Sequence, residues 1–170
     1  MQERKVTTYI TDALFELLKS KELVNITTTE IIQKAGVCRS SFYRNFYLPE
    51  DVIRRYGITM FEQIARDIPI AHSGIRQHIE AVNTYFWNHR ERLSLIEQRG
   101  LFHLLEGPIM EHCKLQIQRM GAWNNRYQAE FYAGAVTQLL RAWARNDFAE
   151  SPEEISRIIY TLLNHDSLKL

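Results

Sequence analysis

The stretch at positions 26–46 constrains the fold most, because it predicts two short helices joined by a tight turn. Thr27, followed three residues later by Glu30, forms a capping-box pattern that marks the start of the first helix. Gly36 is expected to end that helix, since a residue there often needs a positive φ, which glycine adopts without steric cost. A second helix is predicted from about Arg39 to Asn45. We interpret the stretch as a helix-turn-helix with this second helix as the recognition helix.

The free face of the second helix has the composition of a DNA-reading surface. Phe42 and Phe46 are expected to be buried, which leaves small hydroxyl side chains, arginines and a tyrosine facing outward. Small residues permit close approach to a groove, arginine pairs with guanine or phosphate, and tyrosine reaches phosphate. The candidate DNA-binding residues are Thr27, Thr28, Arg39, Ser40, Ser41, Tyr43, Arg44 and Asn45.

The charge of this region, rather than that of the whole chain, favours a polyanionic partner. The 170 residues carry a formal net charge of +1, whereas positions 34–55 contain five basic and two acidic side chains. Affinity for DNA depends on the phosphates that a protein neutralises locally. A nearly neutral chain is therefore expected to bind DNA well when two copies act together.

Apolar periodicity predicts an all-α protein with a small head and a larger body, and no β pattern is present. Residues 1–48 form the three-helix head, in which a first helix at 4–21 braces the two motif helices. Residues 49–170 form the body, which begins with a connector helix at 49–68. We expect Pro69 to end the connector and segment 71–74 to be the boundary behind it. Further helices are predicted at 74–92, at 93–105 with an interruption at Gly100, at 109–120 after a break at Gly107-Pro108, at 127–146 and at 152–164.

Several other classes of protein are not indicated. No apolar run approaches the ~20 residues of a membrane span and the N-terminus is polar, so a soluble cytoplasmic protein is expected. Cys38 and Cys113 lie too far apart to suggest a disulfide framework or a zinc site, and His103 and His112 complete no tight ligand motif. No nucleophile elbow, phosphate-binding glycine loop or clustered carboxylate pair occurs. We expect no enzyme activity, metal or cofactor.

The helix-turn-helix and the residues after it resemble the TetR/AcrR family of transcriptional regulators. The family pattern is similar to I-A-x-x-A-G-V-S-x-x-x-F-Y-x-H-F-x-S-K-E-D-L. The matching segments are 31–37, 41–46 and 50–52, with the ending F-Y-R-N-F that other helix-turn-helix proteins lack. The resemblance covers the first third of the chain at the level of sequence, and the remainder only in helical layout. It implies that Thr27, Tyr43 and Asn45 contact phosphate, that Arg39, Ser40 and Ser41 face bases, and that Arg44 does either.

The chain departs from this pattern at both ends of the recognition helix. Cys38 replaces the common capping serine, and a thiol is the poorer hydrogen-bond acceptor, so the cap is expected to be weak. A helix N-terminus beside Arg39 also favours a thiolate, so a thiol switch at Cys38 is a hypothesis. Asn45 replaces the usual histidine, and Leu48-Pro49 replaces Ser-Lys, which puts one phosphate contact in doubt.

The resemblance further implies a homodimer on a palindromic operator. The residues alone leave two alternatives for the last two helices, at about 127–146 and 152–164: a hairpin packed on its own body, or a four-helix bundle with a second copy. The resemblance favours the second. A repressor released by a small-molecule effector is expected, with the effector changing the spacing of the heads through the connector. An activator of the same type and a helical protein–protein adaptor without its own operator are the alternatives.

The body also contains a dense aromatic set with histidines and arginines among it. At helical spacing such a set is plain core or the lining of an effector pocket, and the sequence leaves both open. The candidate effector-binding residues are Tyr85, Phe86, His89, Arg99, Phe102, His103, Trp123 and Phe131.

Overall fold

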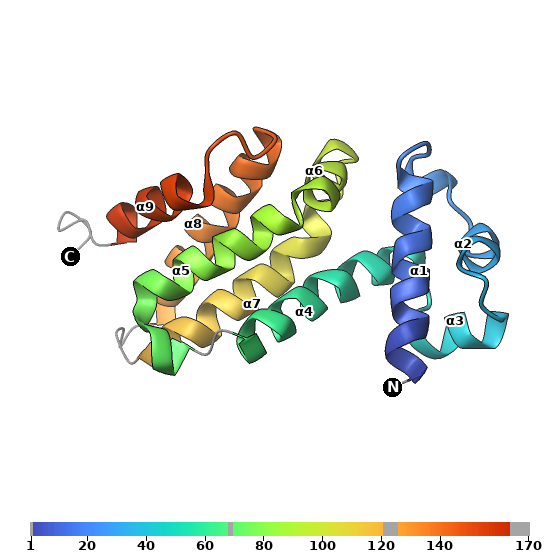
Figure 1. The fold of residues 1–170 in the computed structure, drawn as a ribbon, viewed down its shortest axis with the longest axis horizontal. Coiled ribbons are helices and arrows are strands. Elements are labelled where there is room, and N and C mark those ends of the chain that lie inside the picture. Colours follow the sequence, from blue (N-terminus) through green and yellow to red (C-terminus); the bar gives the residue numbers. More distant parts are fainter. Residues whose placement is uncertain (1, 68–69, 121–125, 164–170) are drawn as a thin grey trace.

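A computed structural model describes residues 2–67, 70–120 and 126–163, and every regular element in these ranges is helical (Figure 1). The all-α class predicted from periodicity is confirmed. The elements are α1 Gln2–Leu18, the 3₁₀ turn η1 Leu23–Asn25, α2 Thr28–Ala35, α3 Arg39–Asn45, α4 Pro49–Asp67, α5 Ile70–Asn88, α6 Arg90–Gln98, α7 His103–Met120, α8 Arg126–Arg145 and α9 Pro152–Leu163.

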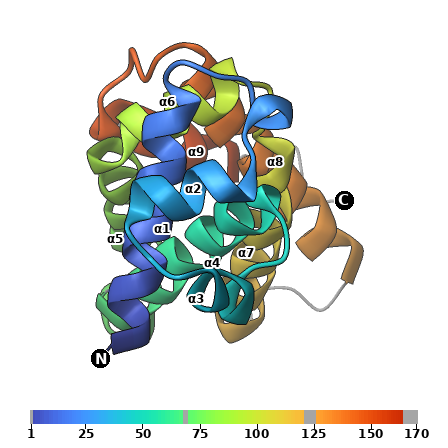
Figure 2. The same cartoon turned by 90° about the vertical axis from the view of Figure 1, so that its right-hand side faces the viewer.

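The head consists of α1, α2 and α3, which lie together at one end of the molecule (Figures 1 and 2). Their apolar faces meet in a small core that α4 completes. The buried members include Ile10, Leu14, Leu18, Leu23, Ile26, Ile31, Phe42, Phe46, Val52 and Ile53. α1 begins and ends two to three residues earlier than predicted, because the backbone after Leu18 turns, with the N–H groups of Ser20 and Lys21 donating to the carbonyl of Leu17.

α4 connects the head to the body, as the sequence predicted (Figure 1). Pro49 is its first residue, where the missing N–H costs nothing. The Asp51 carboxylate accepts hydrogen bonds from the backbone N–H groups of Tyr47 and Leu48 at 3.1 and 2.9 Å, which fixes the entry into the helix. The last predicted residue of the connector, Ile68, and its predicted terminator Pro69 lie outside the described residues.

Two predicted boundaries in the body are wrong at its amino-terminal side. α5 already begins at Ile70, so the expected boundary at 71–74 is helical, and the helix ends at Asn88. A separate short helix, α6, follows at Arg90–Gln98 and ends before Gly100, whose φ is 69°. The interruption predicted at Gly100 is confirmed. Apolar spacing alone did not locate the break before α6, because His89 continues the helical register of α5 while adopting a non-helical backbone.

The predicted break at Gly107-Pro108 is also wrong, since α7 runs through Pro108. A proline inside a helix removes one backbone hydrogen bond and strains the preceding turn. Here the same turn packs against α4 at Gly57. A Cβ atom at Gly57 would come within 2.9 Å of Cδ2 of Leu105 and within 3.5 Å of Cβ and Cγ of Pro108. The turn that contains the proline is thus packed closely against α4.

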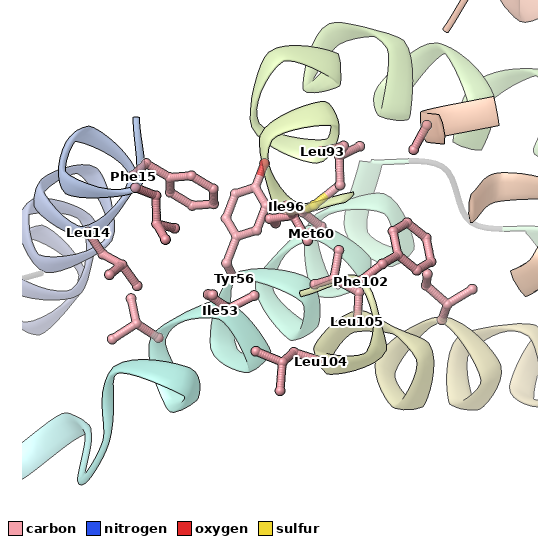
Figure 3. Close-up of a cluster of buried hydrophobic side chains, with 14 of the residues drawn as sticks. Leu14, Phe15, Ile53, Tyr56, Met60, Leu93, Ile96, Phe102, Leu104 and Leu105 are labelled. Carbon is pink, nitrogen blue, oxygen red and sulfur yellow. The ribbon is translucent and has the colours of Figure 1, made fainter. Parts of the chain in front are cut away.

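Head and body share a continuous core at Tyr56 (Figure 3). The Tyr56 ring meets Phe15 of α1 edge-on, with ring centroids 5.0 Å apart. Its hydroxyl shares a hydrogen bond of 3.2 Å with Nδ1 of His89, and burial raises the pKa of this tyrosine. Tyr56 of α4 therefore connects Phe15 of the head with His89 of the body.

Within the described ranges, no helix has the length and apolar character needed to cross a membrane.

Candidate nucleic-acid interface

The helix-turn-helix is built by local hydrogen bonds that the sequence predicted. Oγ1 of Thr27 accepts from the N–H of Glu30 at 3.2 Å, and the Glu30 carboxylate accepts from the N–H of Thr27 at 2.9 Å. The hydrogen bond from Lys21, followed by those from Thr27, lowers the pKa of Glu30 to about 2. Gly36 has φ 65° and donates its N–H to the carbonyls of Gln33 and Ile32, which ends α2 and turns the chain into α3.

α3 presents the predicted face to solvent. Phe42 and Phe46 are 0% and 2% exposed and anchor the helix in the head core. The predicted outward residues Arg39, Ser40, Tyr43 and Arg44 are all exposed. The recognition-helix geometry expected from the sequence is therefore present.

Tyr43 links the exposed faces of α2 and α3. Its hydroxyl lies 3.4 Å from Oγ1 of Thr28, and the guanidinium carbon of Arg39 lies 5.4 Å from the centroid of its ring. The hydrogen bond with Thr28, and then the positive charge of Arg39, lower the pKa of the phenol. These three predicted DNA-contact residues thus form one connected surface across the turn.

Two of the other predicted contact residues use their polar groups within the head. The Thr27 hydroxyl accepts from the N–H of Glu30 and donates to the Glu30 carboxylate at 2.9 Å, so it serves the cap. Asn45 is partly buried, and its Nδ2 donates to the backbone carbonyl of Ser41 at 2.8 Å. Their phosphate contacts remain predictions, and either contact would compete with these internal hydrogen bonds.

A polar groove extends the exposed surface beyond α3, and sequence reasoning did not identify it. It has a volume of about 730 Å³. Its lining comes from three helices: Thr7 and Thr8 of α1, Arg44, Asn45 and Phe46 at the end of α3, and Arg55, Thr59, Glu62, Gln63, Arg66 and Asp67 of α4. The available signal was the polar stripe of α4, in which arginines recur on one helical face. Nothing local to that stripe indicates that Arg44 lies beside it.

Cys38 stands at the amino-terminal end of α3 without a side-chain cap, as predicted. Its Sγ atom instead forms hydrogen bonds with the hydroxyls of Ser40 and Ser41, at 3.2 and 3.0 Å. These hydroxyls, with Ser40 contributing most, lower the pKa of the exposed thiol to about 7. A thiolate is thus available at neutral pH on the face that is predicted to meet DNA.

The candidate effector-binding residues are dispersed over the body. Tyr85 and His89 stack with ring centroids 4.4 Å apart against α4, where the Tyr85 hydroxyl donates to Oε1 of Gln63 at 3.2 Å. Phe86 and Phe102 are core residues at 2% and 0% exposure.

The remaining effector candidates have other surroundings. Arg99 binds the end of α1, and His103 is exposed with Nδ1 3.0 Å from the carbonyl of Gly100. Phe131 is 58% exposed on α8, and Trp123 lies outside the described residues. The described members of the set contact different helices, and the effector site remains a prediction.

An apolar groove runs between α8 and α9 and contains Phe131. Its lining residues are Phe131, Tyr132, Ala135, Val136, Leu139, Ile159 and Leu162, around a volume of about 140 Å³. Phe131 and Leu162 are 58% and 46% exposed. The groove belongs to the two helices that were predicted to pair with a second copy. Nowhere in the described chain do three or more His, Cys, Asp or Glu side chains gather as a metal site.

Comparison with known proteins gives matches to regulators over both parts of the chain. A family model named TetR_C_8, described as a transcriptional regulator C-terminal region, matches residues 98–165. The HTH-type transcriptional regulator YxbF of Bacillus subtilis (strain 168) is 27% identical over 173 residues, which cover 91% of this chain and 44% of YxbF. The chain thus spans less than half the length of this relative.

Two solved structures have the same fold. The dihydroxyacetone kinase operon activator DhaS has a TM-score of 0.65 at 17% identity, with 93% of each chain covered. A protein of Syntrophomonas wolfei str. Goettingen, described as a TetR-family transcriptional regulator, has a TM-score of 0.64 at 18% identity, with 96% of this chain and 95% of that chain covered. At these identities, the likeness concerns the fold alone.

The lowered pKa of Cys38 predicts how its alkylation depends on pH. Because the thiolate is the reactive form and the pKa is about 7, labelling by iodoacetamide should rise to half its maximal rate near pH 7. Cys113 is an internal control, since burial raises its pKa to about 12 and it should stay unlabelled in the folded protein. Ser40→Ala should shift the midpoint upward. Peptide mass spectrometry distinguishes the two sites, and a Cys38 midpoint above pH 8.5 would contradict the assignment.

Proposed function

We propose that this chain is a transcriptional regulator of the TetR family, a homodimer that binds a palindromic operator with α3 in the major groove. The observation that supports this most directly is the exposed surface formed by Thr28, Arg39 and Tyr43 across the α2–α3 turn. Arginine supplies a bidentate donor for guanine, and the flanking hydroxyls supply phosphate contacts. The polar groove beside α3 adds Arg44, Arg55 and Arg66, and Glu62 and Asp67 also line it.

A second copy is needed for this surface to specify a site. A helix of seven residues reads few base pairs, and the chain carries a net charge of only +1. Two symmetric copies read two half-sites that are separated by about one helical turn of DNA, ~34–36 Å, or a multiple of it. We propose that the copies meet at α8 and α9, because the groove between these helices presents Phe131 and Leu162 to solvent. Such apolar side chains are expected to be covered in a stable interface.

The proposal includes a small-molecule effector, for which α7 offers a better polar site than the residues suggested by sequence. Among the described residues, Nε2 of His112 and Oε1 of Gln116 are buried and have no hydrogen-bond partner. They lie one helical turn apart, and the His112 ring stacks on Phe61 with centroids 4.5 Å apart. Burial, followed by the charge of His78, lowers the pKa of His112 to about 4, so the ring is neutral at pH 7. A neutral imidazole and an amide fit an uncharged effector that forms hydrogen bonds.

For the direction of control we propose repression with release by the effector, as the family resemblance implies. DhaS is named as an operon activator, so activation is the alternative within the same architecture. A reporter gene behind the selected operator distinguishes the two by whether loss of the regulator raises or lowers expression. An adaptor without an operator would enrich no palindrome from genomic DNA fragments.

Replacing Arg39 by alanine should weaken binding to an operator enriched from genomic fragments by about 1–3 kcal/mol, which is about 5- to 150-fold in Kd. The loss should be concentrated at one base pair, because a bidentate base contact disappears. Arg76→Ala removes the same charge from an exposed site on α5 and serves as the control. Fluorescence anisotropy at fixed salt measures both, and equal affinities for Arg39→Ala and the wild type would refute the assignment of α3.

Placing a charge in the α8–α9 groove should separate the copies. Phe131→Glu should convert the dimer to a monomer at micromolar concentration, because a desolvated carboxylate would face apolar side chains. Val24→Glu, at a head residue that is 89% exposed, changes charge equally and should leave the dimer intact. Sedimentation velocity gives the mass of each, and an unchanged dimer in Phe131→Glu would rule out this face.

Removing the buried amide of Gln116 should stabilise the protein in the absence of effector. Gln116→Leu is expected to raise the free energy of unfolding by about 1–3 kcal/mol, since it removes a buried acceptor without a partner. Gln118→Leu, at an exposed position of the same helix, should change it by less than about 0.5 kcal/mol. Urea denaturation measures both values. Destabilisation by Gln116→Leu would argue against the effector site.

A further inference from the structure

Helix α6 lies between the head and the helices of the proposed dimer interface. In Figure 1 it lies beside the carboxyl-terminal half of α1, away from the amino-terminal end of the chain. Its apolar residues Leu93 and Ile96 are fully buried, in the core that also holds Tyr56 (Figure 3). Charged residues of α6, and Arg99 directly after it, contact α1 of the head and α8 of the body.

Arg99 binds the end of α1 through three of its donors. Nε donates to the carbonyl of Leu18 at 2.8 Å, and Nη2 donates to the carbonyl of Lys19 at 2.9 Å. Nη1 donates to the Glu22 carboxylate at 2.6 Å. The last carbonyls of a helix lack partners within it, so a rigid, planar guanidinium fixes both the position and the direction of this helix end.

Arg92 provides a second attachment to the same helix. Its Nη2 donates to the Asp12 carboxylate at 2.6 Å, and its guanidinium carbon lies 4.7 Å from the ring centroid of Phe15 and 5.7 Å from that of Tyr56. Asp12 and Leu18 are about 9 Å apart along α1, given a rise of ~1.5 Å per residue. Two attachments at this separation restrain the rotation of α1 as well as its position.

The opposite side of α6 is tied to α8. The side chain of Glu97 is 10% exposed and accepts from Nε of Arg141 at 3.3 Å and from Nε of Arg145 at 3.1 Å. Arg141 also donates to Glu106 of α7 at 3.1 Å. α8 carries Phe131 and the proposed dimer groove. Contacts therefore connect α8, other residues of which line that groove, through Glu97 and α6 to Arg92 and to Arg99 directly after α6, and so to the head.

We propose that this α6 bridge sets the spacing and rotation of the two heads, and with them the half-site separation that the dimer accepts. Arg92 and Arg99 are positioning residues, since the DNA-reading surface of α3 does not include them. The inference rests on the proposed dimeric, operator-binding function. One added base pair turns a half-site by about 34–36° around the DNA axis, because the duplex makes one turn in about 10–10.5 base pairs. Heads that are fixed in rotation cannot follow such a turn, whereas heads held by α4 alone can.

The experiment uses the full chain and an operator selected by the wild-type protein. Affinity is measured for that operator, for versions with one or two base pairs added or removed between the half-sites, and for a duplex with a single half-site. The test variant is Arg92→Met/Arg99→Met, which keeps the aliphatic length and removes the donors. Arg90→Met is the matched control, since Arg90 on the same helix contacts the carbonyl and ring of Trp87 rather than the head.

Wild type and Arg90→Met should bind the selected operator about tenfold or more tightly than the operators with altered spacing. For the double variant this ratio of affinities should be about threefold or less. Affinity for the single half-site should stay within about twofold, because α3 is unchanged. A purely structural defect would instead lower binding to every duplex. Arg99→Lys keeps the charge but not the planar arrangement of donors, so its spacing preference should fall between those of the wild type and the double variant. This single variant replaces the double variant in the test if the latter does not fold.

Two outcomes separate this inference from the proposal beneath it. If the wild-type protein selects a palindrome and the arginine variants keep its full spacing preference, the α6 bridge does not set the head geometry. If the wild-type protein selects no palindrome at all, the proposed function fails, and the inference fails with it.

Discussion

The position of α3 depends on the packing around Tyr56, where head and body meet. The tyrosine belongs to α4 and its ring meets Phe15 of α1 at 5.0 Å, while its hydroxyl reaches His89 at the start of α6. The guanidinium of Arg92 lies over both rings. An aromatic pair with a cation on its face gains from dispersion and from the ring quadrupoles, and it has a defined geometry. The orientation of the head is thus set by side chains that are remote from the DNA-reading surface.

The features that could be predicted from the sequence are those that interactions between residues close in the chain determine. The capping box of Thr27 and Glu30, the positive φ of Gly36 and the burial of Phe42 all depend on residues within a few positions of each other. The start of α9 is of the same kind, since Ser151 and Glu154 cap one another at 3.2 and 2.9 Å. Such signals remain visible in one sequence without knowledge of the tertiary fold.

The structure differs from the prediction at positions where a residue distant in the sequence determines the local structure. Pro108 reads locally as a helix stop, yet Gly57, which lies on another helix, makes room for the turn that contains it. Arg99 was a candidate effector-binding residue, and its partners in the structure are carbonyls at the end of α1. The polar groove likewise combines residues of α1, α3 and α4. Neither apolar periodicity nor motif spacing indicates which residues of different helices come into contact.

The contact between Gly57 and the turn of Leu105 and Pro108 also has a consequence for how this sequence can change. A Cβ atom at position 57 would lie 2.9 Å from Cδ2 of Leu105, so a side chain there requires Leu105 to shift or to be replaced by a smaller residue. The effects of changes at the two sites are therefore non-additive, although they lie far apart in the chain. Related sequences should vary at positions 57 and 105 in a compensating manner, with bulk transferred from one helix to the other.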